Sequence, residues 1–266
     1  MKRVYPNTLG SKRIDIVIQG GIWPTTGRTV ETYLQLPFVN NVIVSTWEHE
    51  FEKIDFKASK FVYSTPPEKD GGGNLNHQII SSHNGLKECE TDVVIKMRSD
   101  QTIPIEEMIR MKKFYEENIK GNEVFVLGLM GLEFPSHPYH PQDHVFWGDT
   151  EQVKEIFDIP LSNWTTYLAD GREDFSKNIR SPMYLGVHKY ARISEITKRH
   201  LEDPSEYLLD NAPKRNEAFE EYSKIKDQCF KSFPPINMIW HKYGGQNYPY
   251  SFYYEQGERY AVWTRR

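Results

Sequence analysis

Three short runs of mostly β-branched residues, each followed by small or polar residues, constrain the fold of this chain most strongly. They are residues 14–18 (IDIVI), 41–47 (NVIVSTW) and 92–97 (DVVIKM). Segments with helical spacing of apolar residues lie between them. Runs of this kind are typical of buried parallel strands that are joined by helices and covered on both faces. We therefore expect an α/β protein with a Rossmann-type, mostly parallel sheet and helices on both of its faces.

Weaker patterns complete the predicted order of elements. Further strands are expected at residues 60–64, 123–128 and 144–148. Helices are expected at 27–37 and from 76 to about 90. A third helix should have Pro104 in its first turn, and a fourth should be capped by Thr150. A loop is predicted at the three glycines 71–73. Beyond residue 160 two helical segments are expected, the second one charged and solvated, followed by an aromatic loop after residue 230. Residues 201–266 are thus predicted to form a helical and aromatic C-terminal annex of the same domain.

Composition narrows the class of protein. The net charge of −4 and the pI of about 6.2 give no basic field that would favour nucleic acid as a partner. Two cysteines without metal-like spacing, Cys89 and Cys229, favour a reducing compartment. No apolar run has the roughly 18 residues of a membrane span. We expect a cytoplasmic protein that at most contacts the inner face of the membrane, where Lys224, Lys226 and Lys231 could meet acidic lipid, although the interspersed acids favour a solvated helix.

The strand at 92–97 ends on charged residues. In open α/β sheets ligands lie beyond the carboxyl ends of the strands. Arg98, Ser99 and Asp100 follow this strand, so Asp100 could hold a divalent cation such as Mn²⁺ or Mg²⁺ that bridges two phosphates, and Arg98 could bind a phosphate. Alternatively, Arg98 and Asp100 form an ion pair that merely closes the strand end. The spacing leaves both interpretations open.

Two other strand ends supply small and aromatic residues. The segment 19–21 (QGG) follows the first strand, and 45–47 (STW) follows the second. Glycine allows a backbone N–H to approach a phosphate or a base, and tryptophan can stack on a ring. The chain has neither a G-x-G-x-x-G fingerprint nor a G-x-x-x-x-G-K-[ST] loop. A dinucleotide oxidoreductase and a phosphate-loop enzyme are therefore disfavoured.

Acidic residues near positions 143 and 173 are the candidates for proton transfer. The segment 137–149 (HPYHPQDHVFWGD) contains three histidines but no H-E-x-x-H pattern, which disfavours a zinc site. Asp143 is interpreted as a group that binds a sugar hydroxyl or acts as a base toward one, and the alternative is a turn cap next to Pro141. Glu173 and Asp174 are either a catalytic base or solvated charges.

Taken in order, IDIVIQGG, NVIVSTW, NHQIISSHNGLKECETDVVIKMRSD and QDHVFWGD resemble the WavE-type lipopolysaccharide synthesis family over roughly residues 12–200. Members of that family resemble nucleotide-sugar glycosyltransferases of the GT-A fold. The resemblance implies a nucleotide-sugar-binding GT-A-like domain at 1–200. It further implies a hexosyltransferase-like enzyme that moves a sugar from a nucleotide-sugar donor to a cell-surface glycan acceptor of the lipopolysaccharide, O-antigen or capsule type.

The resemblance also implies roles for the residues at the strand ends. Arg98, Ser99 and Asp100 stand where GT-A enzymes keep an Asp-x-Asp motif, with arginine in place of the first aspartate. Asp100 is then either a single protein ligand of the metal or a contact to sugar or ribose. The remaining donor contacts implied are Gln19, Gly20, Gly21, Thr46, Asn76 and Gln78.

On the acceptor side, the resemblance favours Asp143 as the acid that faces the sugar. Relatives often carry an acid after the proline matched by Pro182, where this chain has Met183. Asp143, Glu173 and Asp174 therefore remain the candidates for a general base. Two alternatives stay open at this point: a sugar nucleotidyltransferase, disfavoured by the lack of a glycine-rich start with Arg and Lys, and a non-catalytic glycan-binding protein that uses the aromatic tail.

Overall fold

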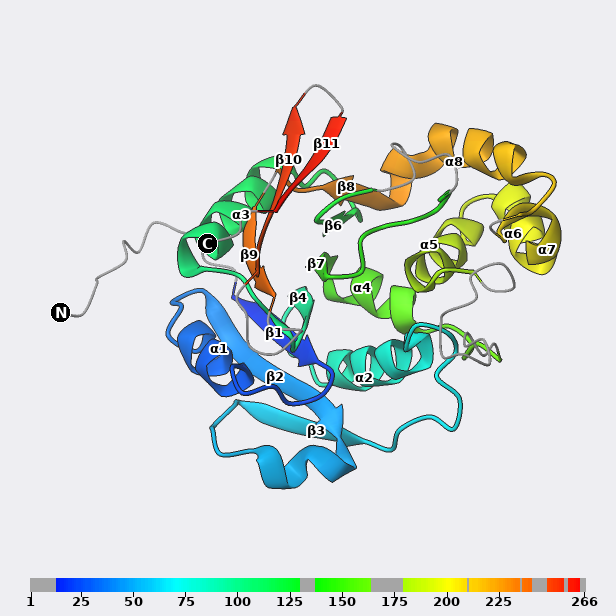
Figure 1. The fold of residues 1–266 in the computed structure, drawn as a ribbon. Coiled ribbons are helices and arrows are strands. Elements are labelled where there is room, and N and C mark those ends of the chain that lie inside the picture. Colours follow the sequence, from blue (N-terminus) through cyan, green and yellow to red (C-terminus); the bar gives the residue numbers. More distant parts are fainter. Residues whose placement is uncertain are drawn as a thin grey trace.

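The computed structural model describes residues 13–129, 137–163, 179–209, 211–234, 236–240, 248–255 and 258–263. Its centre is a seven-stranded sheet with the order β3-β2-β1-β4-β7-β6-β8 (Figure 1). The strands are β1 (Ile14–Gln19), β2 (Val39–Trp47), β3 (Lys60–Ser64), β4 (Val93–Arg98), β6 (Val124–Val126), β7 (Val145–Asp149) and β8 (Phe230–Ser232). Only β7 runs antiparallel to its two neighbours, whereas the other four pairs are parallel. The predicted mostly parallel α/β sheet is confirmed.

The central strands are apolar because both of their faces are covered. All six residues of β1 are buried, and successive side chains of a strand point to opposite faces. Ile16 and Ile18 pack into one core cluster with α1 (Thr26–Tyr33) and α3 (Ile105–Asn118). Val17 belongs to a second cluster with α2 (Leu75–Lys87) and α4 (Thr150–Phe157). Figure 1 shows the two pairs of helices on opposite sides of the sheet.

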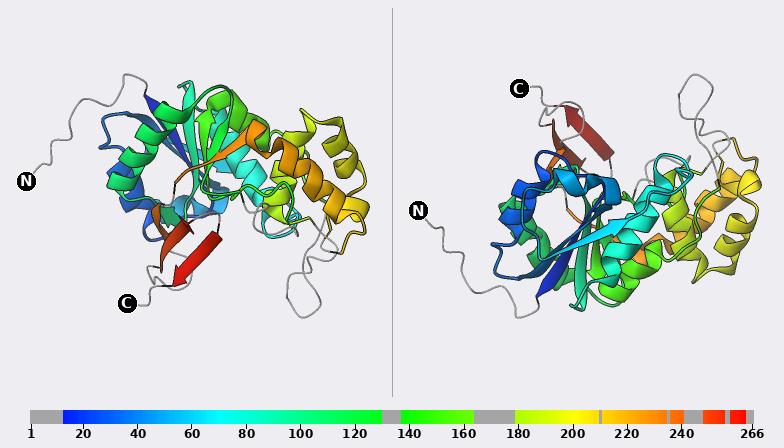
Figure 2. Two further views of the ribbon diagram at one scale, coloured as in Figure 1. Left: turned by 90° about the horizontal axis from the view of Figure 1, so that it is seen from above. Right: turned by 90° about the horizontal axis from the view of Figure 1, so that it is seen from below.

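Four further helices lie together at one end of the molecule, beyond α2 and α4 (Figure 2). They are α5 (Ser181–Ala191), α6 (Glu195–Glu202), α7 (Pro204–Tyr207) and α8 (Arg215–Cys229). We expected the segment of α8 to be solvated, but Ala218 and Tyr222 are fully buried. Ile225 and Cys229 are buried on the same helix, and so are the charged residues Arg215 and Glu221. None of the helices described is long and apolar enough to cross a membrane.

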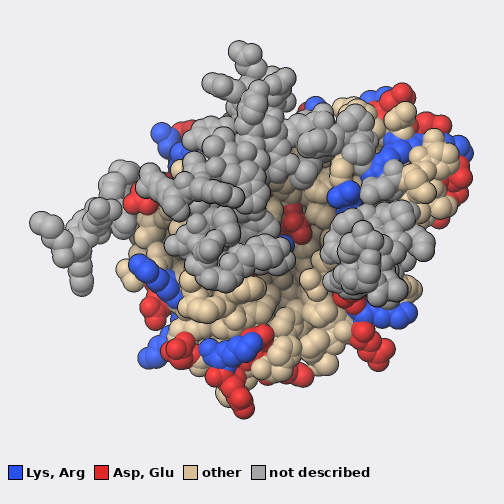
Figure 3. Space-filling model, viewed as in Figure 1, with Lys and Arg blue, Asp and Glu red and all other residues tan. Residues whose placement is uncertain are grey.

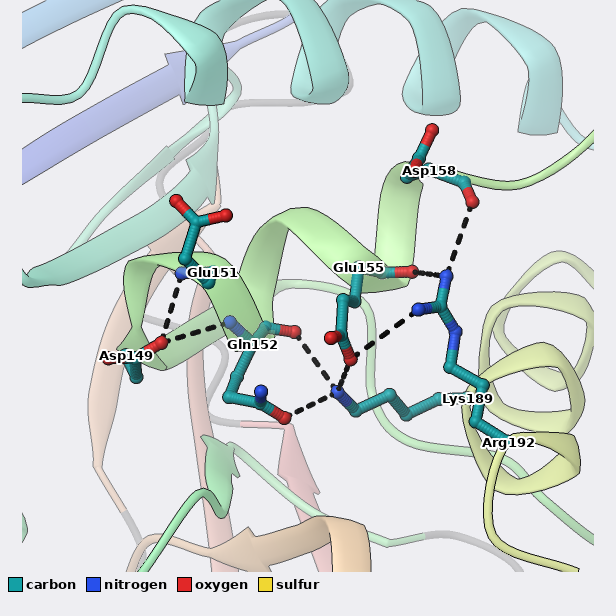
Figure 4. Close-up of polar contacts among 7 residues, drawn as sticks. All are labelled: Asp149, Glu151, Gln152, Glu155, Asp158, Lys189 and Arg192. Atoms are coloured by element: carbon teal, nitrogen blue, oxygen red, sulfur yellow. Dashed lines mark hydrogen bonds and ion pairs between the residues drawn. The ribbon is translucent and has the colours of Figure 1, made fainter.

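Helices α4 and α5 are joined by a polar network (Figure 4). The buried ammonium of Lys189 donates to the main-chain oxygen of Gln152 (3.3 Å), to the side-chain oxygen of Gln152 (2.8 Å) and to Glu155 (2.7 Å). Arg192 donates to the carbonyl oxygens of Glu155 and Asp158. A buried charge with this many partners ties the C-terminal helices to the helix that follows β7.

The C-terminal part contains strands where we expected an aromatic loop. β8 pairs with β6 in the main sheet. A second sheet has the order β11-β10-β9-β5 and consists of β5 (Gln101–Thr102), β9 (Asn237–Trp240), β10 (Tyr248–Glu255) and β11 (Glu258–Trp263). The loop prediction is wrong because aromatic residues favour strands once a partner edge exists, and β5 supplies that edge directly after Asp100.

Two predicted helix starts also differ in detail. Helix α4 is capped by Asp149, whose carboxylate accepts from the N–H groups of Glu151 and Gln152 (Figure 4). The hydroxyl of Thr150 instead donates to the carbonyl oxygen of Thr91. Aspartate is a stronger cap than threonine, which accounts for the shift of one residue. Pro104 is the N-cap of α3 and precedes its first turn.

Candidate functional site

A cavity of about 320 Å³ opens at the carboxyl ends of β1, β2 and β4, beside the first turn of α2. Figure 3 shows a hollow in the middle of the molecule with acidic and basic atoms at its floor. The residues that line the cavity are Gln19, Gly20, Gly21, Trp23, Trp47, Gly73, Asn74, His77, Gln78, Arg98, Ser99, Asp100 and Asp143. Eight of the residues predicted for the site thus lie together in one cavity wall.

The ends of β1 and β4 are tied together through a glycine turn. The N–H of Ser99 donates to the carbonyl oxygen of Gln19 (2.9 Å), and the hydroxyl of Ser99 donates to that of Gly21 (2.7 Å). Gly20 has φ of +118°, and a Cβ there would lie 2.8 Å from the oxygen of the Ser99 hydroxyl. Both the backbone conformation and the available space therefore require glycine. The turn lets backbone groups reach the cavity wall.

Arg98 and Asp100 form a bidentate ion pair in the cavity wall. Arg98 Nε donates to Asp100 Oδ1 (2.9 Å) and Nη2 donates to Oδ2 (2.8 Å). The side chain of Asp100 is 6% exposed and that of Arg98 is 25% exposed. A parallel two-bond pair of this kind is the strongest geometry for arginine and carboxylate. The ion pair that the sequence left as an alternative is present, and it faces a cavity.

A metal ion held by protein groups alone does not fit these residues. Both carboxylate oxygens of Asp100 accept from Arg98. Within the part of the chain that the structure describes, no group of three or more His, Cys, Asp or Glu side chains could hold a metal ion. Divalent cations need several oxygen ligands, so the proteins that bind them through one carboxylate rely on substrate phosphates and water. Asp100 as a metal ligand stays a prediction.

The first turn of α2 supplies the cavity with the positive end of a helix. Gly73, Asn74, His77 and Gln78 line the cavity, and α2 runs for 13 residues away from it. Asn74 has φ of +61°, which places the chain in the left-handed region just before the helix. Helix N-termini favour anions such as phosphates because their N–H groups and their dipole point outward.

Two aromatic rings form an apolar part of the cavity wall. Trp47 packs edge-on against His77, with ring centroids 5.0 Å apart and planes at 83°. Burial lowers the pKa of His77, so its ring is uncharged at neutral pH. Trp23 lines the cavity from the loop after β1. Flat aromatic side chains suit a planar base or a sugar ring, whereas Arg98, Asp100 and Asp143 make another part of the wall charged.

Two residues predicted to contact the donor lie outside the cavity wall. Asn76 uses its amide within the chain, since it donates to the carbonyl oxygens of Lys69 (3.0 Å) and Ser162 (2.8 Å) and accepts from the N–H of Ser162 (2.8 Å). Thr46 is fully buried, and its hydroxyl has no hydrogen-bond partner among the residues described. Neither side chain is among those that line the cavity.

Asp143 faces the same cavity from the segment before β7. Its main-chain oxygen accepts from Gln78 Nε2 and from Lys96 Nζ, both at 3.3 Å. Burial raises the pKa of the Asp143 carboxyl, but the nearby His144, Arg98 and Lys96 outweigh it and hold that pKa below its ordinary value. Asp143 is therefore ionised at neutral pH. It can accept a hydrogen bond or a proton from a hydroxyl group.

The other acidic candidates lie elsewhere. Glu173 and Asp174 fall outside the described residues. Met183, which stands where relatives often carry an acid, is fully buried in the core cluster beside α4 and within 3.9 Å of the guanidinium of Arg215. Met183 is not among the residues that line the cavity, and its side chain carries no proton acceptor for an acceptor hydroxyl.

The sequence did not identify Trp23, Gly73, Asn74 and His77 as lining residues. The sequence did hold a signal for Gly73, Asn74 and His77. The run GGGN directly precedes a predicted helix, and the N-termini of helices bind anions. Nothing in the pattern around Trp23 distinguishes it from a residue of the core.

With this site in view, comparison with protein families is decisive. The family described as WavE lipopolysaccharide synthesis matches residues 14–189. The chain belongs to the WavE lipopolysaccharide synthesis family. The matched segment runs from β1 into α5 and therefore includes every residue that lines the cavity. The resemblance seen in the sequence is confirmed, and membership places this WavE family protein in glycan synthesis.

The solved structures compared are distant likenesses. A putative glucose-1-phosphate thymidylyltransferase from Bacillus anthracis is 9% identical and has a TM-score of 0.38, with 87% of this chain and 90% of that chain covered. TarS from S. aureus is 15% identical with a TM-score of 0.36, covering 68% and 33%. A 4-diphosphocytidyl-2C-methyl-D-erythritol synthase from Anaerococcus prevotii is 10% identical with a TM-score of 0.38, covering 55% and 74%. No curated protein matches. Likenesses this distant carry no argument about substrate.

Proposed function

We propose that this WavE family protein is a glycosyltransferase that moves a sugar from a nucleotide-sugar donor to a hydroxyl of a cell-surface glycan of the lipopolysaccharide, O-antigen or capsule type. One observation carries the proposal. The glycine turn after β1, the start of α2, the pair of Arg98 and Asp100, and Asp143 all meet in one cavity at the carboxyl end of the sheet. That combination offers an aromatic wall, a site for anions and an ionised carboxylate.

The donor diphosphate would bind between Arg98 and the first turn of α2. During transfer the acceptor oxygen forms a bond to the anomeric carbon, and the bond from that carbon to the diphosphate oxygen breaks. The diphosphate leaves with the electron pair, so negative charge grows on it in the transition state. Hydrogen-bond donors that are held in place before the reaction stabilise such charge by about 3 kcal/mol each, which raises the rate by 10²- to 10³-fold. Arg98 and the N–H groups of α2 are suited to this task.

Asp143 would act on the acceptor side. Its carboxylate is ionised and can accept the hydrogen bond of the attacking hydroxyl. A general base in this position raises the reaction rate by about 10²- to 10⁴-fold. Because the pKa of Asp143 is held low, the carboxylate is a weak base. We therefore assign it chiefly the orientation of the hydroxyl, and we propose Asp143, Glu173 and Asp174 as the acids among which the final proton acceptor is found.

The proposal is tested by ligand binding and then by turnover. A thermal-shift screen of nucleoside diphosphates and nucleotide sugars, with and without Mn²⁺, should identify one preferred nucleobase. A ligand at 100 times its Kd stabilises the folded protein by about 2.7 kcal/mol. A larger rise in melting temperature when Mn²⁺ is present would support Asp100 as a metal ligand. Release of nucleoside diphosphate in the presence of a glycan acceptor then measures transfer.

Variants at the site have matched controls on the surface. Asp143→Asn and Arg98→Lys are expected to lower turnover by about 10²-fold or more. Glu151→Gln and Arg110→Lys, whose side chains are 75% and 47% exposed, should leave turnover unchanged. If no nucleoside diphosphate binds, or if the site variants keep full turnover, the proposed function is wrong. Release of pyrophosphate from a nucleoside triphosphate and a sugar phosphate would instead identify a nucleotidyltransferase.

A further inference from the structure

A buried lysine lies beneath the candidate site. Lys96 is in the middle of β4, between Val17 of β1 and Phe146 of β7, and its side chain is completely buried. Lys112 and Lys189, the other buried lysines described, form ion pairs with Glu116 and Glu155. For Lys96 no carboxylate lies within ion-pair distance among the residues that the structure describes. Burying an ammonium costs several kcal/mol, so an apolar residue here would serve the fold at least as well.

The contacts of this lysine lead toward the cavity. Its Nζ lies 5.4 Å from the ring centroid of Phe146 and 5.0 Å from that of Phe157, which are cation–π distances. Its Nζ donates a hydrogen bond to the carbonyl oxygen of Asp143 (3.3 Å). Gln78 of α2 donates to the same oxygen (3.3 Å). Two side chains from different elements therefore fix the peptide that carries the carboxylate.

The charge of Lys96 also acts on Asp143. The ionisable groups around it are Asp143, Arg98 and Asp100, and Asp143 also interacts with His140 and His144. Burial lowers the pKa of Lys96 to about 7, and the carboxylate of Asp143 opposes that shift. In turn, the ammonium helps to keep the pKa of Asp143 low. The two groups thus stabilise each other's charged forms across the floor of the cavity.

We propose that Lys96 is a positioning residue of the transfer reaction, which holds the peptide of Asp143 from beneath the cavity. This inference rests on the proposed function. Lys96 touches neither donor nor acceptor, because it lies behind the cavity wall. Its effect should therefore appear in the turnover of bound substrates and not in the affinity for the donor. A displacement of a catalytic carboxylate by about 1 Å can cost 10²-fold in rate.

Lys96→Met tests this proposal, with Lys112→Met as the matched control. Methionine keeps the length of the side chain but removes the charge and the donor. For Lys96→Met we expect a melting temperature no lower than that of the wild type, donor Kd within about twofold, and kcat reduced by roughly 10-fold to 10²-fold. The acid limb of the pH profile of kcat should move to higher pH, because Asp143 loses a neighbouring positive charge. Lys112→Met should leave kcat and the acid limb unchanged.

The outcomes separate this inference from the proposed function. If the wild type binds no nucleoside diphosphate and transfers no sugar, both are overturned. If the wild type is active and Lys96→Met keeps its kcat and its acid limb, only the role of Lys96 is overturned, and the same holds if donor affinity falls in parallel with kcat. Should the methionine variant not fold, Lys96→Gln, which removes the charge but keeps a donor, must show the same shift of the acid limb.

Discussion

Removing the arginine of the bidentate pair should destabilise the protein more than removing the whole pair. Arg98→Met leaves the carboxylate of Asp100, whose side chain is 6% exposed, without its two charged donors. Breaking a fully buried pair from one side costs about 3–5 kcal/mol, and an exposed pair is worth about 0–1 kcal/mol. Because one quarter of the Arg98 side chain is exposed, we expect a loss of roughly 2–3 kcal/mol. At about 2–4 °C per kcal/mol, the melting temperature should fall by about 5–10 °C.

Thermal unfolding of Arg98→Met, Asp100→Asn and the double variant measures this effect. The double variant should melt above Arg98→Met, since it leaves no buried unpaired charge. Arg110→Met is the control, because the Arg110 side chain is 47% exposed in its i,i+3 pair with Glu107, and it should lose less than about 1 kcal/mol. If Arg98→Met melts within about 1 °C of the wild type, or if the double variant is no more stable than Arg98→Met, the carboxylate of Asp100 is not held by this pair and the reasoning is refuted.

Three further predictions concern stability and the cavity. At Gly20, where φ is +118°, alanine would place its Cβ 2.8 Å from the hydroxyl oxygen of Ser99. The affinity of Gly20→Ala for a nucleoside diphosphate should therefore fall by about tenfold or more in calorimetric titration. Gly186→Ala places a Cβ 1.8 Å from the carbonyl oxygen of Tyr139 and should cost about 3 kcal/mol in urea unfolding, whereas Gly121→Ala meets nothing closer than 3.7 Å and should change stability by about 0.5 kcal/mol at most. Burial lowers the pKa of His140 to about 4; the unfolded chain therefore binds more protons below about pH 6.5, and stability falls as pH falls. Between pH 7 and 5 the loss from this group is about 2 kcal/mol, and His140→Gln should abolish that part of the slope.

The sequence predicted the position of the site because strand ends are readable and share one edge. Apolar runs identified β1, β2 and β4, and the carboxyl ends of parallel strands meet at the same edge of a sheet. Gln19, Arg98 and Asp143 were therefore expected near one another, and they line one cavity. The roles of these residues in donor and acceptor binding stay predictions.

What the sequence did not reveal depends on which way single side chains face. Thr46 and Trp47 are consecutive residues of β2, so they point to opposite faces, and only the tryptophan reaches the cavity. Asn76 and His77 differ in the same way within the first turn of α2. The register of a strand and the rotation of a helix are set by packing across the whole core, which no local pattern encodes. The strands β9–β11 were missed for a related reason, since their pairing begins at β5, a two-residue strand far away in the sequence.

Charge along β4 cannot be explained by stability alone. Lys96 and Arg98 lie two residues apart and therefore on the same face of the strand, one fully buried and the next at the cavity. Replacing buried ionic groups with apolar side chains of similar volume is often neutral or stabilising, so a strand selected only for its core would be apolar up to its end. Both cations instead act on carboxylates of the cavity wall, Arg98 on Asp100 and Lys96 on the segment of Asp143. The simplest physical account is that β4 places cationic side chains where they favour the ionised forms of two carboxylates in the cavity wall.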